Sequence, residues 1–109
     1  MTYTDSFYTN RKSAALTSAR RVAPWLFERM RVSSIADVGC GTGSWLATFT
    51  ELGVTDVHGF DGPWLPVERL EIPRGKFSTI DFTRLEDFTV QRRFDLVISL
   101  EVAELLTAD

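Results

Sequence analysis

The residues most able to do chemistry lie in one short stretch, in which glycines alternate with other residues: Asp37-Val38-Gly39-Cys40-Gly41-Thr42-Gly43. Glycine has no Cβ, so the backbone of such a turn is open to close approach by a ligand. One carboxylate, Asp37, stands two residues before the first glycine, and a second, Asp61, ends the next apolar run. Two acids around a glycine turn predict a binding site for a nucleoside-containing cofactor.

The residues after the turn separate the ligand classes that bind at a strand, a glycine turn and a helix. A phosphate-binding loop needs lysine and then Ser or Thr after its last glycine. Here Ser44 follows Gly43 directly, which excludes that class. The dinucleotide fingerprint needs Gly-x-Gly-x-x-Gly or Ala. Its sixth position is Ser44 when counted from Gly39, so an NAD-binding oxidoreductase fragment is a disfavoured alternative.

The spacing Asp37-x-Gly39-x-Gly41-x-Gly43 resembles the first motif of the class I S-adenosylmethionine-dependent methyltransferases. In that family the turn passes beneath the amino-acid and ribose parts of the cofactor. S-adenosylmethionine carries no phosphate, so no lysine is needed, and its ammonium and sulfonium groups favour nearby carboxylates. The resemblance covers about residues 34–106. It implies a chain that binds S-adenosylmethionine, with S-adenosylhomocysteine as product and no metal.

Later residues extend the resemblance. Asp61 stands where the family has an acid that accepts hydrogen bonds from both ribose hydroxyls, each contributing about 1.5–3 kcal/mol. Asp81 stands where an acid often binds the adenine amino group, and Phe94–Ser99 resembles the fourth-strand motif. Glu101 follows that motif and is the weak candidate for a catalytic residue. The cofactor contacts that the resemblance implies are Asp37, Gly39, Cys40, Gly41, Gly43, Asp61, Gly62, Trp64, Asp81, Phe82 and Leu100.

Each candidate also has a structural interpretation that the sequence leaves open. Asp37 could orient the turn through backbone hydrogen bonds, and Asp61 could form the turn before Gly62. Asp81 could be an ordinary strand-end acid, and Trp64 could cap the core instead of lining an adenine site. Glu101 could start a helix, where its charge suits the helix dipole. His58, in the middle of a predicted strand, is expected to be structural, and no cluster of residues has metal-ligand spacing.

The elements expected to position these residues form an α/β, Rossmann-like parallel sheet, because short apolar strands alternate with helical or irregular crossovers. A helix should open at Thr42 or Gly43 and end near Gly53, a residue suited to the left-handed position after a helix. Its residues expected to face the sheet are Trp45, Leu46, Phe49 and Leu52. The resemblance implies the strand order 3-2-1-4. The expected strands are 34–38, 57–60, 76–80 and 94–100. Residues 67–70 could make a single helical turn, and a last helical stretch is expected to begin near Glu101.

The chain is expected to be one domain, 1–109, in three parts. Residues 1–10 read as an N-terminal arm, and 34–109 as the S-adenosylmethionine-binding half of a methyltransferase domain. Residues 11–31 read as helix because apolar side chains recur at spacings of three and four. Pro24 should kink this helix or divide it into two short ones. Its expected core-facing residues are Leu16, Ala19, Ala23, Leu26 and Met30, with Trp25 and Phe27 also in the core.

The composition limits the partners. The 109 residues are 44% hydrophobic with a net charge of −3, which is ordinary for a globular domain and argues weakly against a nucleic-acid scaffold. A single cysteine excludes an internal disulfide, and no apolar run reaches the roughly 20 residues that span a bilayer. The default location is cytoplasmic, and the default methyl acceptor is an unidentified small molecule.

The chain departs from the family in length, because the family's sheet has seven strands and only the first four are expected here. The fourth strand would then be an exposed apolar edge that invites pairing with another chain, including a second copy. The chain could be a fragment, could pair to cover the edge, or could be a relative without catalysis. The main alternative function is therefore a non-catalytic S-adenosylmethionine-binding or interaction module.

Overall fold

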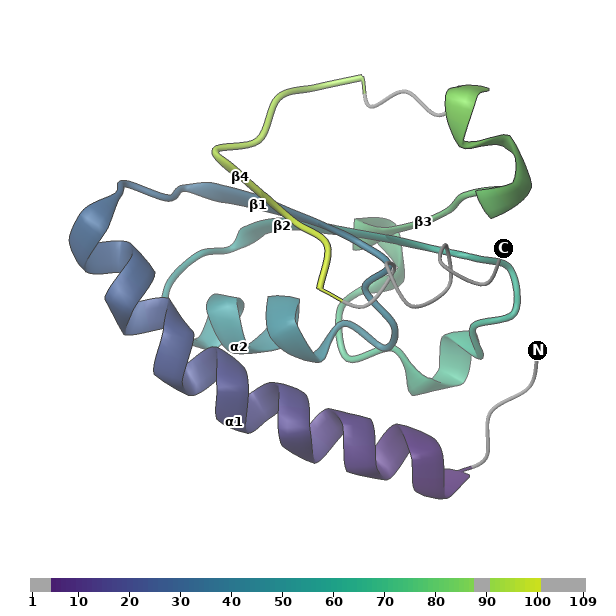
Figure 1. Cartoon of the computed structure of the whole chain (residues 1–109), viewed down its shortest axis with the longest axis horizontal. Helices are drawn as coiled ribbons and strands as arrows, with labels where there is room; N and C mark the ends of the chain where they lie inside the picture. Colours follow the sequence, from purple (N-terminus) through teal and green to yellow (C-terminus); the bar gives the residue numbers. More distant parts are fainter. Residues whose placement is uncertain (1–4, 88–90, 101–109) are drawn as a thin grey trace.

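A parallel sheet lies at the centre of the computed structural model, which describes residues 5–87 and 91–100 (Figure 1). Its four strands have the order β3-β2-β1-β4, and every neighbouring pair is parallel. The predicted fold class and strand order are confirmed. The strands are β1 (Ser34–Val38), β2 (Asp56–Asp61), β3 (Phe77–Thr79) and β4 (Leu96–Ile98).

The strand bounds match the prediction closely for the two central strands and less well for the outer two. β1 has the predicted bounds, and β2 is one residue longer at each end. β3 and β4 are shorter than the predicted ranges 76–80 and 94–100. β3 starts later because Lys76 ends a short 3-10 helix, η2 (Arg74–Lys76). β4 is short because its pairing with β1 covers only Leu96–Ile98. The helix predicted from Glu101 lies outside the described residues.

The register brings the ends of β1 and β2 together. Val38 pairs with Phe60, the residue before Asp61. The amides of Gly39 and Cys40 then both donate to the carbonyl of Phe60, at 2.7 and 3.1 Å. The glycine turn therefore begins beside the carboxyl end of β2, as expected for ligand sites in open parallel sheets.

Helix α2 (Ser44–Glu51) follows the turn directly. The helix ends where predicted, with Gly53 at a φ of 108°. Leu46 and Phe49 are buried against the sheet, as predicted. The expectation that Leu52 faces the sheet is wrong. Leu52 is the C-cap residue, where the chain leaves the helix, and it is 45% exposed.

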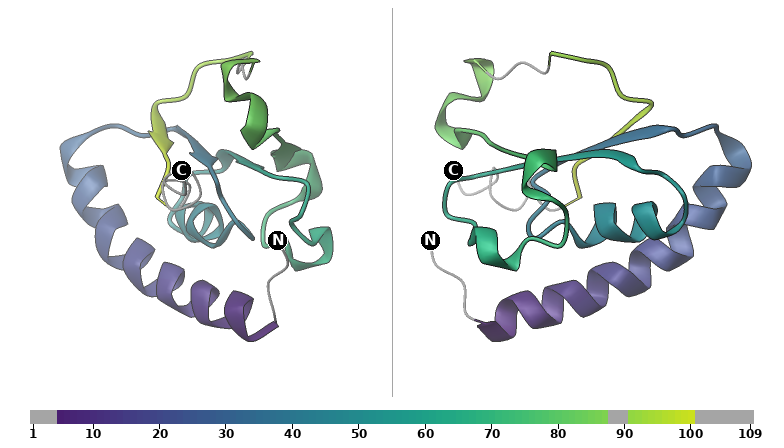
Figure 2. Two further views of the ribbon diagram at one scale, coloured as in Figure 1. Left: turned by 45° about the vertical axis from the view of Figure 1, so that its right-hand side comes forward. Right: turned by 180° about the vertical axis from the view of Figure 1, so that it is seen from behind.

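Helix α1 (Asp5–Arg29) is a single element, longer than predicted. Residues 5–10 belong to this helix and not to an arm, while residues 1–4 lie outside the described range. The expected division at Pro24 is wrong, because the helix continues through this residue. Figure 2 shows that α1 curves along the outside of α2, and Ala23, Leu26 and Phe27 near the C-terminal end of α1 pack in the core.

The buried face of α1 is narrower than predicted. Ala19 and Ala23 are completely buried, and Leu26 and Phe27 are half-buried against the core. Small residues at this contact let the two helices approach closely. Trp25 was expected in the core but is 54% exposed, because it lies on the outer face and stacks with Arg29, whose Cζ is 4.1 Å from a ring centroid. Met30 is also exposed, against expectation.

The two helices cover one face of the sheet, and the main core lies between them and the strands (Figure 1). A smaller cluster lies on the other face, where Ala36, Phe60 and Ile80 are buried and Val38 and Phe82 pack against them.

None of the helices in residues 5–87 and 91–100 combines the length and apolar character needed to cross a membrane. The remaining short helices are η1 (Val67–Arg69), where a single turn was predicted, and η3 (Phe82–Asp87).

Candidate cofactor-binding site

The glycine turn has a backbone conformation that other residues rarely adopt. Gly39, Gly41 and Gly43 have φ values of 80°, 58° and 87°. A Cβ placed on Gly43 would lie 3.1 Å from Ile72, whereas one on Gly41 would meet no described atom within 4 Å. The backbone at Gly41 is therefore the part of the turn that a ligand can approach.

Asp61 ends β2 directly beside the turn. One of its carboxylate oxygens, Oδ2, accepts a hydrogen bond from the amide of Gly41 at 2.7 Å, and Oδ1 accepts one from Gly62 at 2.7 Å. Burial raises the pKa of Asp61, and the two backbone hydrogen bonds oppose this rise. The bond from Gly62 agrees with the structural interpretation of Asp61, and the bond from Gly41 also fixes the glycine turn. Each carboxylate oxygen keeps a second lone pair for a ligand hydroxyl.

Asp37, near the end of β1, is also buried, but its surroundings differ from those of Asp61. Its side chain is on the same face of the sheet as Asp61, and its residue is 3% exposed. The oxygen Oδ1 is buried and has no hydrogen-bond partner among the described residues. Burial and the charge of Asp61 raise the pKa of Asp37 from 3.8 to about 8. No described group uses this oxygen, so it is available to interact with a bound ligand.

Cys40 lies within the turn but its side chain belongs to the core. A Cβ on Gly59 would lie 2.6 Å from the Cys40 sulfur, so the glycine at that position makes room for the thiol. Burial, with the charges of Asp37 and Asp61, raises the pKa of the thiol well above its ordinary range. Cys40 is therefore not a thiolate nucleophile. The thiol instead donates to the carbonyl of Gly41 at 3.3 Å.

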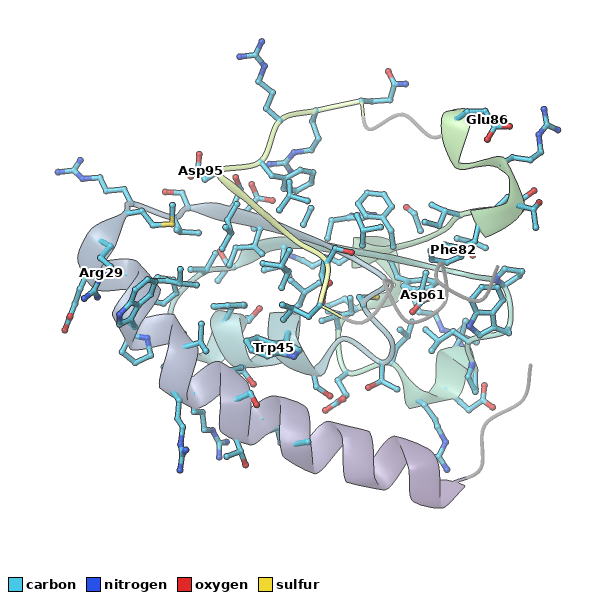
Figure 3. All side chains as sticks on the ribbon, viewed as in Figure 1. Arg29, Trp45, Asp61, Phe82, Glu86 and Asp95 are labelled. Carbon is cyan, nitrogen blue, oxygen red and sulfur yellow. The ribbon has the colours of Figure 1, made fainter. Side chains whose placement is uncertain are left out.

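An aromatic pair stands at the same end of the sheet. Trp64 and Phe82 have ring centroids 5.4 Å apart, and Trp64 covers Gly62, where any Cβ would lie 2.2 Å from the indole. Figure 3 shows Asp61 and Phe82 near the end of the sheet where β2 and β3 finish. Trp64 is partly exposed, whereas its neighbour Leu65 is buried. This arrangement offers flat apolar surface next to Asp61.

The remaining predicted residues are placed differently. Asp81 is exposed, and its Oδ1 accepts hydrogen bonds from the amide and hydroxyl of Thr83 at 2.9 and 2.6 Å, which lower the pKa of Asp81. These bonds match its structural interpretation as a strand-end acid. Leu100 is exposed just beyond β4. Glu101 lies outside the described residues.

His58 is on the opposite face of the sheet from Asp37 and Asp61. Its Nε2 lies 2.7 Å from the hydroxyl of Ser78, and burial lowers the pKa of His58. In the part of the chain that the structure describes, no three His, Cys, Asp or Glu side chains gather closely enough to hold a metal ion.

Sequence reasoning missed one residue at the site, Glu71. Its Oε2 accepts hydrogen bonds from the hydroxyls of Thr42, at 2.7 Å, and Ser44, and its amide donates to the carbonyl of Thr42 at 2.7 Å. Glu71 lies in the irregular segment between η1 and η2. No periodicity or motif marks it, so the only signal was an acid in a loop that must return past the turn.

Comparison with known proteins finds relatives of the chain. No family model matches the chain. The chain is 34% identical over 103 residues to the ubiquinone biosynthesis O-methyltransferase of Bradyrhizobium sp. (strain ORS 278), covering 84% of this chain and 40% of that protein. The chain therefore spans about 40% of the length of the curated relative that it matches.

Two solved structures have the same fold. The crystal structure of Streptomyces venezuelae DesVI superimposes with a TM-score of 0.62 at 29% identity, covering 88% of this chain and 40% of that one. CalS10 from Micromonospora echinaspora, an amino pentose methyltransferase solved with S-adenosylmethionine bound, gives a TM-score of 0.63 at 23% identity, covering 94% of this chain and 44% of that one. With the glycine turn and the strand order β3-β2-β1-β4, these relatives identify the chain as part of a class I S-adenosylmethionine-dependent methyltransferase domain, and the described residues form four strands of its sheet.

Proposed function

We propose that the chain binds S-adenosylmethionine at the carboxyl ends of β1 and β2, and that the protein transfers the cofactor's methyl group to a small-molecule acceptor. The observation that carries this proposal is the Asp61 carboxylate, held by the amides of Gly41 and Gly62 beside an open glycine backbone. Both oxygens are oriented before any ligand arrives, and each can accept one ribose hydroxyl. Such preorganisation lowers the entropic cost of binding.

The other residues of the site fit the chemistry of this cofactor. Oδ1 of Asp37, to which no described group donates, lies in a buried region where a cationic ammonium or sulfonium would be favourable. Trp64 and Phe82 offer aromatic surface for a purine ring. Described side chains near the turn include no lysine in the position that a phosphate-binding loop requires. These features favour S-adenosylmethionine over a nucleoside phosphate.

The role of the protein is chiefly to bind and orient, because S-adenosylmethionine itself supplies an activated methyl group. A general base is required only where the acceptor must lose a proton. We propose Glu101 as the weak candidate for that base, and Asp81 and Leu100 as further cofactor contacts. The curated relative is named as an O-methyltransferase and CalS10 as an amino pentose methyltransferase, which supports a hydroxyl or amine of a small molecule as the acceptor.

Titration calorimetry with S-adenosylmethionine tests the proposal on wild type, Asp61→Ala and Asp61→Asn. Asp61→Ala should weaken binding by about 2–4 kcal/mol, because it removes both ribose acceptors and the support of Gly41. Asp61→Asn keeps one acceptor oxygen and should fall in between. His58→Ala, on the opposite face of the sheet, is the matched control and should bind as wild type does. Equal affinity in Asp61→Ala and wild type would rule out the ribose role.

Methyl transfer is tested separately from binding. NAD should not compete with S-adenosylmethionine, and S-adenosylhomocysteine should. Transfer of a labelled methyl group to a panel of small hydroxyl and amine compounds would establish catalysis. Cofactor binding without any transfer would instead support the non-catalytic binding module.

A further inference from the structure

The loop between β2 and β3 returns to the glycine turn, where Glu71 forms hydrogen bonds with it. The amide of Glu71 donates to the carbonyl of Thr42 at 2.7 Å, while the Thr42 hydroxyl donates to Oε2 of Glu71 at 2.7 Å. The hydroxyl of Ser44, the first residue of α2, donates to the same oxygen. One carboxylate oxygen thus joins the end of the turn to the start of the helix.

The next residue adds an apolar contact to this polar one. Ile72 is buried, and three of its side-chain carbons lie 3.1–3.3 Å from the position of a Cβ on Gly43. The same side chain lies 3.2 Å from the position of a Cβ on Gly59 of β2. Ile72 therefore fills the space that these two glycines leave, and fixes the position of Glu71 relative to the turn.

The turn is consequently held from two sides, with Gly41 between them. On the β2 side, Asp61 binds the amide of Gly41. On the loop side, Glu71 binds Thr42 and Ser44, which lie one and three residues later. Neither contact covers Gly41, where no described atom lies within 4 Å of a Cβ position. The two acids have different tasks: Asp61 faces the proposed cofactor, whereas Glu71 supports the backbone beneath it.

We propose that Glu71 is a positioning residue for S-adenosylmethionine, acting through Thr42 and Ser44 on the backbone of the glycine turn. This inference rests on the proposed function. Hydrogen bonds from two hydroxyls to one carboxylate oxygen favour one conformation of a glycine-rich segment, which otherwise has many. Loss of the carboxylate leaves the turn free to move and misplaces the amide that Asp61 requires.

The first test compares Glu71→Ala with Glu71→Gln by titration calorimetry with S-adenosylmethionine, at a temperature where circular dichroism shows each variant folded. Glu71→Ala should raise the Kd about tenfold. Glu71→Gln should bind within about threefold of wild type, because its amide oxygen accepts both hydroxyls. Glu68→Ala, in η1 of the same loop, is the control and should bind as wild type does.

The two substitutions separate positioning from direct contact. If the charge of Glu71 itself attracted the cationic cofactor, Glu71→Gln would lose as much affinity as Glu71→Ala, and that result would overturn the inference. An unchanged Kd in folded Glu71→Ala would overturn it as well. In a double-mutant cycle, Thr42→Val should add little to the effect of Glu71→Ala, because both remove the same contact.

A second readout does not depend on the cofactor. The amide of Gly43 donates to the carbonyl of Cys40 at 3.0 Å, and its hydrogen exchange reports opening of the turn. Exchange at Gly43 should be faster in Glu71→Ala than in wild type and Glu68→Ala; equal exchange would contradict the role of Glu71. If wild type does not bind S-adenosylmethionine, the proposed function fails, while the exchange result still decides whether Glu71 holds the turn.

Discussion

At the scale of single residues, the site contains two buried carboxylates whose surroundings differ. Both oxygens of Asp61 accept a backbone amide, whereas Oδ1 of Asp37 has no hydrogen-bond partner within residues 5–87 and 91–100. An unpaired charge is costly in the interior, so Asp37 holds its proton to a much higher pH than usual. Asp37 is thus the residue at which the stability of the protein without cofactor should depend on pH.

We expect the free energy of unfolding to fall as pH rises from about 4 to 8. The pKa of Asp37 is raised from 3.8 to about 8 on folding, so within this window the folded protein holds a proton that the unfolded chain has lost. The contribution of Asp37 is complete below pH 4, decreases by at most about 1.4 kcal/mol per pH unit, and is exhausted above pH 8. Urea unfolding at several pH values measures this slope.

Asp37→Asn is the control for this prediction. It has no proton to lose, so most of the slope should disappear, and the variant should be more stable than wild type at pH 8. The raised pKa of Asp61 acts in the same direction and leaves a smaller slope behind. Parallel pH profiles of wild type and Asp37→Asn would contradict the assignment.

The predictability of the site also differs from residue to residue. Asp37, Asp61 and the glycines could be found because their types and spacing relative to strand ends carry the signal. Glu71 could not, because its role depends on the path of a proline-containing loop and on the contact of Ile72 with Gly43. Trp64 could be placed near the site only in general terms, since its stacking with Phe82 joins residues from different segments.

At the scale of elements, the burial of α2 was predictable in its interior and not at its end. Apolar periodicity correctly identified Leu46 and Phe49 but included Leu52, which lies at the C-cap and is exposed. Periodicity describes a continuing helix, so it fails where the chain turns away. Trp25 was assigned to the core because its side chain is apolar, but it lies on the outer face of α1.

Two identical substitutions in α2 should have very different effects. Leu46 is 0% exposed and Leu52 is 45% exposed. Leu46→Ala should lower the free energy of unfolding by about 2–5 kcal/mol, through lost burial and the cavity left behind. Leu52→Ala should change it by less than about 1 kcal/mol. Urea denaturation measures both, and similar losses in the two variants would contradict the packing of α2.

The continuity of α1 through Pro24 gives a second prediction at this scale. Proline cannot donate a backbone hydrogen bond to Arg20, yet contacts of Ala19 and Ala23 with the core keep the helix whole. Pro24 is exposed, so Pro24→Ala removes no core contact and restores the missing donor. We expect a gain of about 1–3 kcal/mol in stability.

Thermal unfolding of Pro24→Ala against wild type checks this expectation, with the exposed substitution Val22→Ala as a control for a neutral change. A lower melting temperature for Pro24→Ala would show that the proline stabilises α1 in its curved form.

At the scale of the whole molecule, the sheet has unequal faces, and β4 is an edge strand among the residues that the structure describes. Both α1 and α2 lie on one face, as Figure 2 shows from two sides. Within the described chain β4 pairs with a strand only on its β1 side, and Val97 in its middle is 60% exposed. Strand order was predictable because the resemblance implied it. Which partner meets the β4 edge was not, because an edge offers the same backbone groups to any strand.

We expect this edge to pair with a second copy of the chain. Sedimentation velocity over a range of concentrations should show reversible self-association of wild type. Val97→Lys should shift the equilibrium toward monomer by about tenfold or more, since charged residues on an edge oppose pairing. Val22→Lys, exposed on α1, is the matched control. A single monomeric species at all concentrations would exclude pairing at the β4 edge.

The restraints on the glycine turn also determine when it can form. The carbonyl of Phe60, the carboxylate of Asp61 and the side chains of Glu71 and Ile72 all follow the turn by about 20 to 30 residues. Closing such loops costs chain entropy before the contacts repay it. During synthesis the turn must therefore leave the ribosome without its final shape. It acquires that shape only after Ile72 has emerged.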